Sequence, residues 1–64
     1  MKITLRAARV NAGLTQKDAA ASLKISNKTL GNWENGVSAP NVKNLASLCA
    51  LYGVEYDNII FFNK

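Results

Sequence analysis

The sequence predicts a small all-α domain of five helices, and three observations support this prediction. Apolar residues recur at helical spacing along most of the chain, and no segment alternates between polar and apolar residues as a strand does. Gly13, Gly36 and Gly53 each follow such a segment, where a helix is expected to end. With 64 residues and 48% hydrophobic content, the chain can build one core and is too short for a second. We therefore expect residues 1–64 to form a single domain.

The first helix is expected over residues 4 to 12, with Thr4 as its N-cap and Gly13 at its end. A spacing of i, i+3, i+4 and i+7 places four of its side chains on one face: Leu5, Ala8, Arg9 and Ala12. Leu14 follows as an apolar anchor before the next helix.

Residues 16–36 are predicted to form two short helices joined by a tight turn. Thr15 is the expected cap of the first, because Asp18 stands three residues further on, the spacing of a capping box. Ala19 and Ala20 fall on its inner face, and such small side chains let a second helix approach closely.

The second helix of this pair is expected to be capped by Ser26 and to bury Leu30 and Trp33. Its outward side chains are all polar: Asn27, Lys28, Thr29 and Asn32. Asn35 and Gly36 then supply residues that tolerate positive φ and stop the helix.

The fourth helix is predicted from Val42 to about Tyr52, because Asn41 after Pro40 is a good N-cap and Gly53 a good end. We expect it to be the central element of the core, buried on more than one side. Its apolar stripe is Val42, Leu45, Ala46, Cys49 and Tyr52, widened by Leu48 and Leu51.

A short fifth helix is predicted from Tyr56 to about Phe61. Asp57 would lie in its first turn, where a negative charge is favourable, and Ile59 and Ile60 would be its core contacts. Val54 is expected to anchor the connection before it.

Composition argues against several functional classes. No apolar run approaches the roughly 20 residues of a membrane span, and no secretory signal is visible, so we expect a cytoplasmic protein. The chain has no His and one Cys, Cys49, so neither a metal site nor an internal disulfide is expected. Paired carboxylates and a Gly-rich phosphate loop are also missing, so we expect neither an enzyme nor a cofactor or small-molecule ligand.

The net charge of +4 is unevenly distributed. Residues 1–43 carry seven basic and two acidic residues, whereas the remaining third is slightly acidic. A basic face on a small helical domain indicates a polyanionic partner, although surface lysines that only keep the protein soluble would produce the same imbalance.

The motif from residue 16 to residue 36 resembles the phage-repressor type of helix-turn-helix domain, the lambda and 434 repressor and Cro group of the XRE family. The resemblance covers nearly the whole chain and depends on these positions: Gln16, Ala20, Ile25, Leu30 and the run Trp33–Gly36. It implies a lambda-repressor-like fold. Lys24 departs from the family, which usually has Gly at the turn, so Lys24 has to adopt a left-handed conformation at a cost of about 1 kcal/mol.

The resemblance also implies that residues 27–34 form a recognition helix in the major groove of double-stranded DNA. Short polar side chains near the start of such a helix can reach base edges. The expected base-reading residues are Asn27, Lys28, Thr29 and Asn32. The alternative is that these four residues form an ordinary solvated helix face.

Phosphate contacts are expected from two groups of residues. Gln16 and Asn35 match the family's phosphate contacts at the start of the first motif helix and just after the recognition helix. Arg6, Lys17 and Lys43 are added on charge alone.

Two structural contacts are also expected. The resemblance implies an ion pair between Arg9 and Glu34 that joins the first helix to the end of the third. Phe61 and Phe62 are expected to contact a second copy of the chain, because the C-terminal third is less basic and rich in aromatic residues. Core packing is the alternative for these two side chains.

The most concrete functional prediction is a transcription regulator that binds a pseudo-palindromic operator as a homodimer and represses by covering a promoter. Activation through contact with polymerase is a variant of the same prediction. The alternative class is a protein-binding helix-turn-helix module, such as an antitoxin or antirepressor. Such a module does not need polar, base-reaching side chains at Asn27, Lys28 and Asn32.

Overall fold

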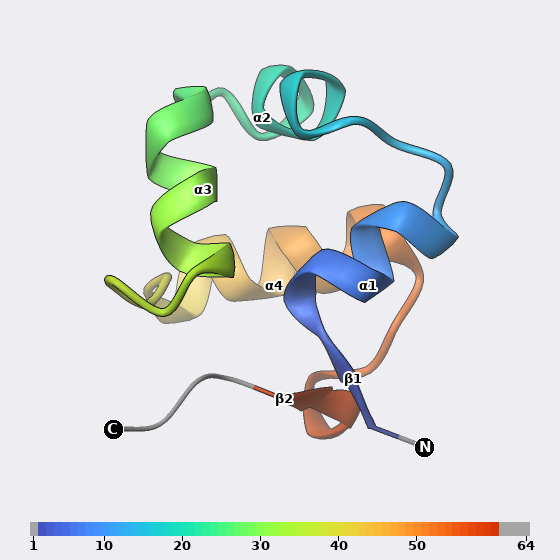
Figure 1. Ribbon diagram of the computed structural model, residues 1–64. Helices are drawn as coiled ribbons and strands as arrows, with labels where there is room; N and C mark the ends of the chain where they lie inside the picture. The colour runs from blue at the N-terminus through green and yellow to red at the C-terminus, as the bar shows by residue number, and fades with distance from the viewer. Residues whose placement is uncertain (1, 61–64) are drawn as a thin grey trace.

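The computed structural model describes residues 2–60, which fold as four α-helices closed by a short parallel strand pair (Figure 1). In chain order the elements are β1 (Ile3–Thr4), α1 (Leu5–Asn11), α2 (Gln16–Leu23), α3 (Asn27–Glu34), α4 (Val42–Tyr52), the 3₁₀ turn η1 (Tyr56–Asn58) and β2 (Ile59–Ile60). The predicted all-α domain is therefore confirmed in its four helices. The predicted count of five is not.

Each helix begins at the cap that the sequence predicts. The side-chain oxygens of Thr4, Thr15, Ser26 and Asn41 accept the backbone N–H three residues on, at 3.1, 3.0, 3.1 and 2.8 Å. Each bond satisfies one of the N–H groups that a helix start leaves without a partner.

Each helix is also followed within two residues by one left-handed residue: Gly13, Lys24, Gly36 and Gly53. Asn35, expected to share this role with Gly36, has φ −93° instead. The residue after each of them donates its N–H to a carbonyl five residues back, as in the Schellman motif. At the turn between α2 and α3, Ile25 N donates to Ala20 O at 3.0 Å and Lys24 N to Ala21 O at 3.2 Å. Lys24 has φ 61° and ψ 42°, so the left-handed conformation predicted for this lysine is confirmed.

The core lies where α1, α2 and α3 meet α4 and β2. Its buried hydrophobic members are Leu5, Ala8, Ala19, Ala20, Leu30, Trp33, Leu48, Tyr52 and Ile59. Ala19 and Ala20 have almost no exposed surface, and they contribute to the crossing of α2 over α3 and α4, as predicted.

The buried face of α4 differs from the predicted one. Leu48 and Tyr52 are buried, Leu45 and Cys49 are half-buried, and Val42 is 84% exposed. Both faces of α4 are apolar, so helical spacing alone does not tell which of them the other helices cover. The expectation that this helix is buried along its whole stripe was wrong.

The predicted fifth helix is replaced by η1 and β2. Ile59 is extended, with φ −87° and ψ 130°, and pairs with Ile3, while Ile60 pairs with Thr4. Consecutive β-branched residues suit a strand, but two residues are too few to show alternation, so the sequence pattern missed the pair. Ile59 is buried as predicted, whereas Ile60 is 43% exposed and not a core contact.

The strand pair joins the two ends of the described chain. Lys2 Nζ also donates to the carbonyl oxygen of Asp57 at 2.7 Å beside it. The segment directly before α1 is therefore the pairing partner of β2.

Candidate nucleic-acid interface

The polar face of α3 is presented to solvent at its first turn. Asn27 and Lys28 are exposed, whereas Thr29 and Asn32 are half-buried. Leu30 and Trp33 bury the opposite side, so α3 is attached to the core along one face only. The side chains expected to reach bases therefore share one accessible face of a short, capped helix.

Thr29 has a local partner. Its Oγ1 lies 2.9 Å from Ser26 Oγ, and its N–H bonds the same Ser26 oxygen at 3.1 Å. The hydroxyl is thus shared with the cap of α3, which leaves Asn27, Lys28 and Asn32 as the better-placed candidates for base contacts.

Gln16 at the start of α2 lies against the second half of α3. Its Nε2 donates to Glu34 Oε1 at 3.2 Å, and a Cβ at Gly31 would stand 3.6 Å from the same nitrogen. Nε2 carries two hydrogens, so the bond to Glu34 uses one N–H and does not use the second. The sequence did not indicate this contact between α2 and α3.

A buried ion pair attaches the end of α3 to α1. Arg9 Nε donates to Glu34 Oε2 at 2.7 Å, and the two side chains are only 10% and 3% exposed. Arg9 also donates to the carbonyl oxygen of Leu14 at 2.9 Å. Glu34 therefore receives bonds from both α1 and α2, and α3 is held at a defined position relative to those helices.

Tyr52 of α4 lies within the electrostatic influence of this pair. Burial first, and then the Glu34 carboxylate, raise the pKa of Tyr52 to about 12, while the Arg9 guanidinium lowers it. Its hydroxyl is buried and has no hydrogen-bond partner among residues 2–60. The phenol therefore stays neutral across the physiological pH range.

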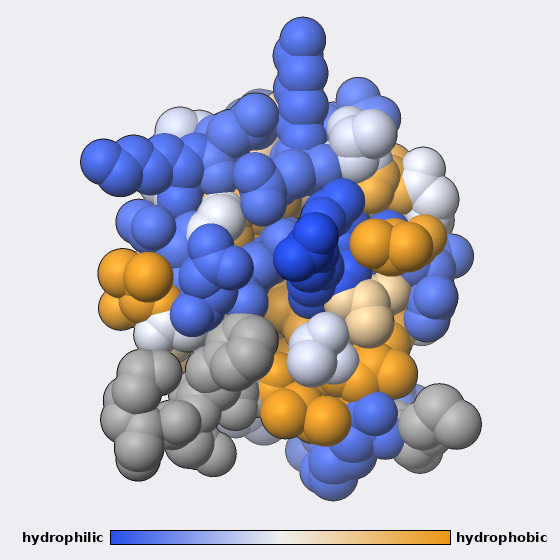
Figure 2. Space-filling view, in the orientation of Figure 1, coloured by the Kyte–Doolittle hydropathy of each residue, from blue (hydrophilic) through white to orange (hydrophobic). Residues whose placement is uncertain are grey.

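Three exposed lysines lie on α3 or on the two segments before it. Lys17 on α2, Lys24 in the turn and Lys28 on α3 are all exposed. Figure 2 shows hydrophilic side chains crowded over α2 and the upper end of α3, and more apolar ones toward β1 and β2. Lys24 was not predicted as a phosphate contact. The sequence feature that could have indicated a phosphate contact is the position of Lys24 in the turn, two residues before Ser26, the N-cap of α3.

The other predicted contacts lie elsewhere on the molecule. Asn35 is exposed and follows α3 directly, while Arg6 and Lys43 are exposed on α1 and α4. Phe61 and Phe62, predicted to contact a second copy, lie outside the described residues.

Two further features were looked for in the described part of the chain, a cluster of metal ligands and a helix able to span a membrane. Within residues 2–60, no three acidic or Cys side chains cluster as ligands for a metal ion. No helix in that range is long and apolar enough to cross a membrane.

Comparison with known proteins identifies the family. The model of the family described as Helix-turn-helix matches residues 5–59. The chain is also 41% identical over 56 residues to the HTH-type transcriptional regulator ImmR of Bacillus subtilis (strain 168). The match covers 88% of this chain and 44% of that regulator, so the chain spans less than half the length of this relative. No solved structure matches. With a left-handed turn between α2 and α3 and a polar outer face on α3, the chain belongs to the helix-turn-helix family, of the phage repressor and Cro (XRE) type.

Proposed function

We propose that this domain binds operator DNA as a homodimer with α3 in the major groove, and that it acts in the cytoplasm as a transcriptional repressor. The observation that carries the proposal is the exposed polar first turn of α3, which includes Lys28, on a helix whose last residue Glu34 is held by a buried ion pair; Lys24 in the preceding turn and Lys17 on α2 are exposed as well. An α-helix fits the major groove of B-DNA, and side chains near its start are the ones that reach base edges.

Within this proposal the residues have different tasks. Asn27, Lys28 and Asn32 read bases, with Thr29 contributing where its bond to Ser26 permits. Phosphate contacts come from Gln16, Lys17, Asn35, Arg6 and Lys43. Phosphate contacts fix the register of the protein on DNA and carry no sequence information directly. Repression would follow from covering a promoter.

The relative's printed name, a transcriptional regulator, supports a regulatory role. Activation by a DNA-bound domain that touches polymerase uses the same interface. The alternative, a protein-binding module such as an antitoxin or antirepressor, places no demand for base-reaching side chains on α3. The polar identity of Asn27, Lys28 and Asn32 therefore favours DNA.

Selection of bound sequences from random double-stranded DNA tests the proposal. We expect a pseudo-palindromic motif whose half-sites lie about one helical turn apart, roughly 34 Å centre to centre. Enrichment of one unrepeated half-site would contradict the homodimer. No enrichment at any salt concentration would contradict DNA reading altogether and favour the protein-binding alternative.

A further inference from the structure

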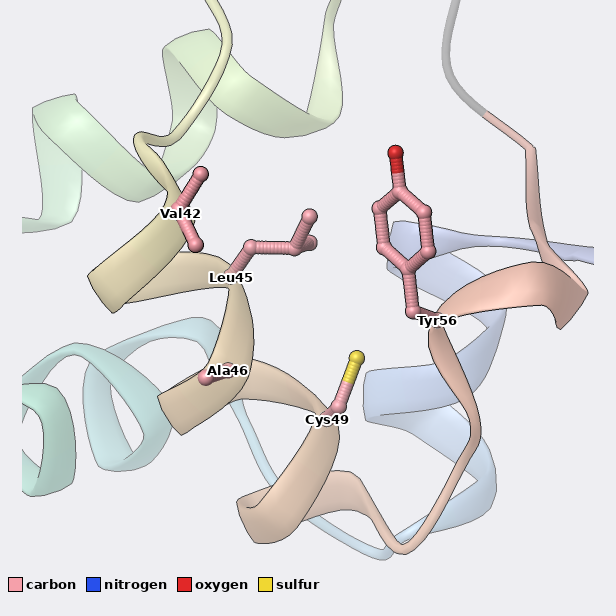
Figure 3. Close-up of a pocket in the computed structure, with 5 residues that line it drawn as sticks. All are labelled: Val42, Leu45, Ala46, Cys49 and Tyr56. Atoms are coloured by element: carbon pink, nitrogen blue, oxygen red, sulfur yellow. The ribbon is translucent and has the colours of Figure 1, made fainter.

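An apolar pocket lies between α4 and η1. Figure 3 shows four side chains of α4 and one of η1 around a space of about 420 Å³. The lining residues are Val42, Leu45, Ala46, Cys49 and Tyr56. The four on α4 belong to the stripe that the sequence pattern predicted to be core.

The pocket extends the hydrophobic core to the surface. Val42 is 84% exposed and Tyr56 is 59% exposed, whereas Leu45 and Cys49 are half-buried. Cys49 also packs against the buried core cluster. Single exposed apolar side chains are common, but a contiguous group of them marks a place where a further apolar group packs.

The chain itself supplies such a group directly after the described residues. Residues 61–64 read Phe-Phe-Asn-Lys and contain both phenylalanines of the chain. Phe61 follows Tyr56, which lines the pocket, by five residues, and five residues span at most about 18 Å. The pocket and two large apolar side chains therefore lie within reach of one another.

The alternation of β2 distinguishes the two phenylalanines. Ile59 is buried and Ile60 is 43% exposed, as expected for successive residues of a strand. Continued along the chain, this alternation puts Phe61 on the side of Ile59 and Phe62 on the side of Ile60. Ile59 belongs to the core cluster against which Cys49 packs, so its side is the one that leads to the pocket.

We propose that the pocket between α4 and η1 is the docking site of residues 61–64 of the same chain, and that the Phe61 side chain fills it. This inference does not depend on DNA binding. It assigns Phe61 to packing within one chain and leaves Phe62 for the expected contact with a second copy.

The chemistry of the pocket suits a phenyl ring. A cavity of roughly 150 Å³ is enough to hold benzene, so a space of about 420 Å³ accommodates the ring. The ring of Tyr56 and the sulfur of Cys49 are both favourable neighbours for an aromatic side chain. Phe61 has no polar atom on its side chain, whereas Asn63 and Lys64 would each lose hydrogen bonds to water there.

Docking also explains how so short a strand pair is held. The strands β1 and β2 contain two residues each, and a pair of this length is not stable without further packing. A ring placed just beyond β2 and packed on α4 would fasten the strand to the core from its second end.

Cys49 reports whether the pocket is covered, because it lines the pocket and is the single cysteine of the chain. Labelling of its thiol by N-ethylmaleimide is compared in the parent, Phe61→Ser and Phe62→Ser, after thermal melts have checked that both variants are folded. Phe62→Ser is the matched control, since it makes the same change at the next position. Phe61→Ser should be labelled at least about tenfold faster than the parent, and Phe62→Ser at the rate of the parent, because only Phe61 shields the thiol.

Labelling of Phe61→Ser that is no faster than that of Phe62→Ser would overturn the docking of Phe61. Rates are also measured at increasing urea concentrations below the melt. A faster rate that is constant at low urea concentration comes from folded molecules and supports the docking. A faster rate that rises with urea from the first addition comes from unfolding and would overturn it.

A disulfide identifies the occupant of the pocket. The Cβ atoms of a disulfide lie about 3.5 to 4.5 Å apart, so mild oxidation should link Phe61→Cys to Cys49 of the same chain and leave Phe62→Cys unlinked. Non-reducing electrophoresis and peptide mass spectrometry separate a link within one chain from a link between two. Equal yields of the link within one chain for both variants would overturn the proposal. So would a link between two chains, or protection of Cys49 in the parent that grows with protein concentration, because a second copy would then cover the pocket.

Discussion

At the scale of single residues, Lys24 carries the clearest local strain. It is the one residue other than glycine with positive φ among residues 2–60, and it closes α2 with its backbone N–H on Ala21 O. A left-handed conformation costs an L-residue with a Cβ roughly 1 to 2 kcal/mol, and glycine avoids that cost.

Lys24→Gly should therefore raise the free energy of unfolding by roughly 1 kcal/mol, measured by urea denaturation. Lys24→Ala is the control, since it removes the same charge and keeps the Cβ. We expect the alanine variant to unfold at the urea concentration of the parent. Equal stabilisation by both substitutions would mean that charge, and not backbone strain, sets the cost of this lysine.

The ionisation of Tyr52 makes the stability of the fold depend on pH. Its pKa is about 12 in the fold and near 10 in the unfolded chain, because burial and the Glu34 carboxylate disfavour the phenolate. The folded state favours the neutral phenol, so the contribution of Tyr52 to the free energy of unfolding is fully present below pH 10. It is lost as the pH rises from 10 to 12, by an amount of order 2 kcal/mol.

Tyr52→Phe should remove that loss. Urea midpoints measured between pH 9 and pH 11 should fall more steeply for the parent than for the phenylalanine variant. At pH 7 the variant should be at least as stable as the parent, because the deleted hydroxyl has no hydrogen-bond partner among the described residues. Parallel pH profiles for the two proteins would contradict the assignment.

Lys28 and Lys17 should differ in the kind of DNA contact they make. Lys28 lies in the first turn of α3 and is expected to reach guanine O6 or N7, whereas Lys17 lies on α2 and is expected to meet only phosphate. Lys28→Ala should cost about 1 to 3 kcal/mol on the selected site and relax the preference at one base pair. Lys17→Ala should weaken all sequences alike and lower the salt slope by about 1.

Fluorescence anisotropy on the selected duplex and on random duplex, at several salt concentrations, separates the two effects. If Lys28→Ala lowers the affinity for both duplexes by the same factor, Lys28 contacts phosphate and does not read a base.

At the scale of elements, the Arg9–Glu34 pair joins α1 to the end of α3, and Gln16 adds α2 to the same carboxylate. Removing one partner of a buried pair leaves an uncompensated charge, at a cost of about 3 to 5 kcal/mol. That is a large part of the stability that a domain of 64 residues can have.

Arg9→Ala and Glu34→Ala should each lower the urea midpoint far more than Lys43→Ala, an exposed control. The combined variant Arg9→Met with Glu34→Leu should recover much of the loss, since it leaves neither charge buried. Unchanged urea midpoints in both single alanine variants would show that the Arg9–Glu34 pair does not stabilise the fold.

At the scale of the whole molecule, charge and apolar surface are separated. The basic, polar surface belongs to α2, the turn and α3. Helix α4 and η1 instead carry an apolar pocket, lined by Val42, Leu45, Ala46, Cys49 and Tyr56 (Figure 3). Under the proposed function, the basic side is the one expected to face DNA. The strand pair β1–β2 joins the two ends of the described chain.

The sequence by itself determined the four helices and their caps, whereas the left-handed turn at Lys24 was expected from the resemblance to the family. These features depend on interactions within a few residues, such as Thr15 with the N–H of Asp18, and such local chemistry is written directly in the residue order. The same holds for the polar face of α3, which follows from helical spacing.

Tertiary structure decided which face of α4 is buried, how Gln16 bonds Glu34, and that Ile59 pairs with Ile3 in a strand. Each of these outcomes joins residues at least 18 positions apart, or chooses between two apolar faces of one helix. Periodicity does not distinguish such alternatives, because a residue's own neighbours in sequence are the same in all of them.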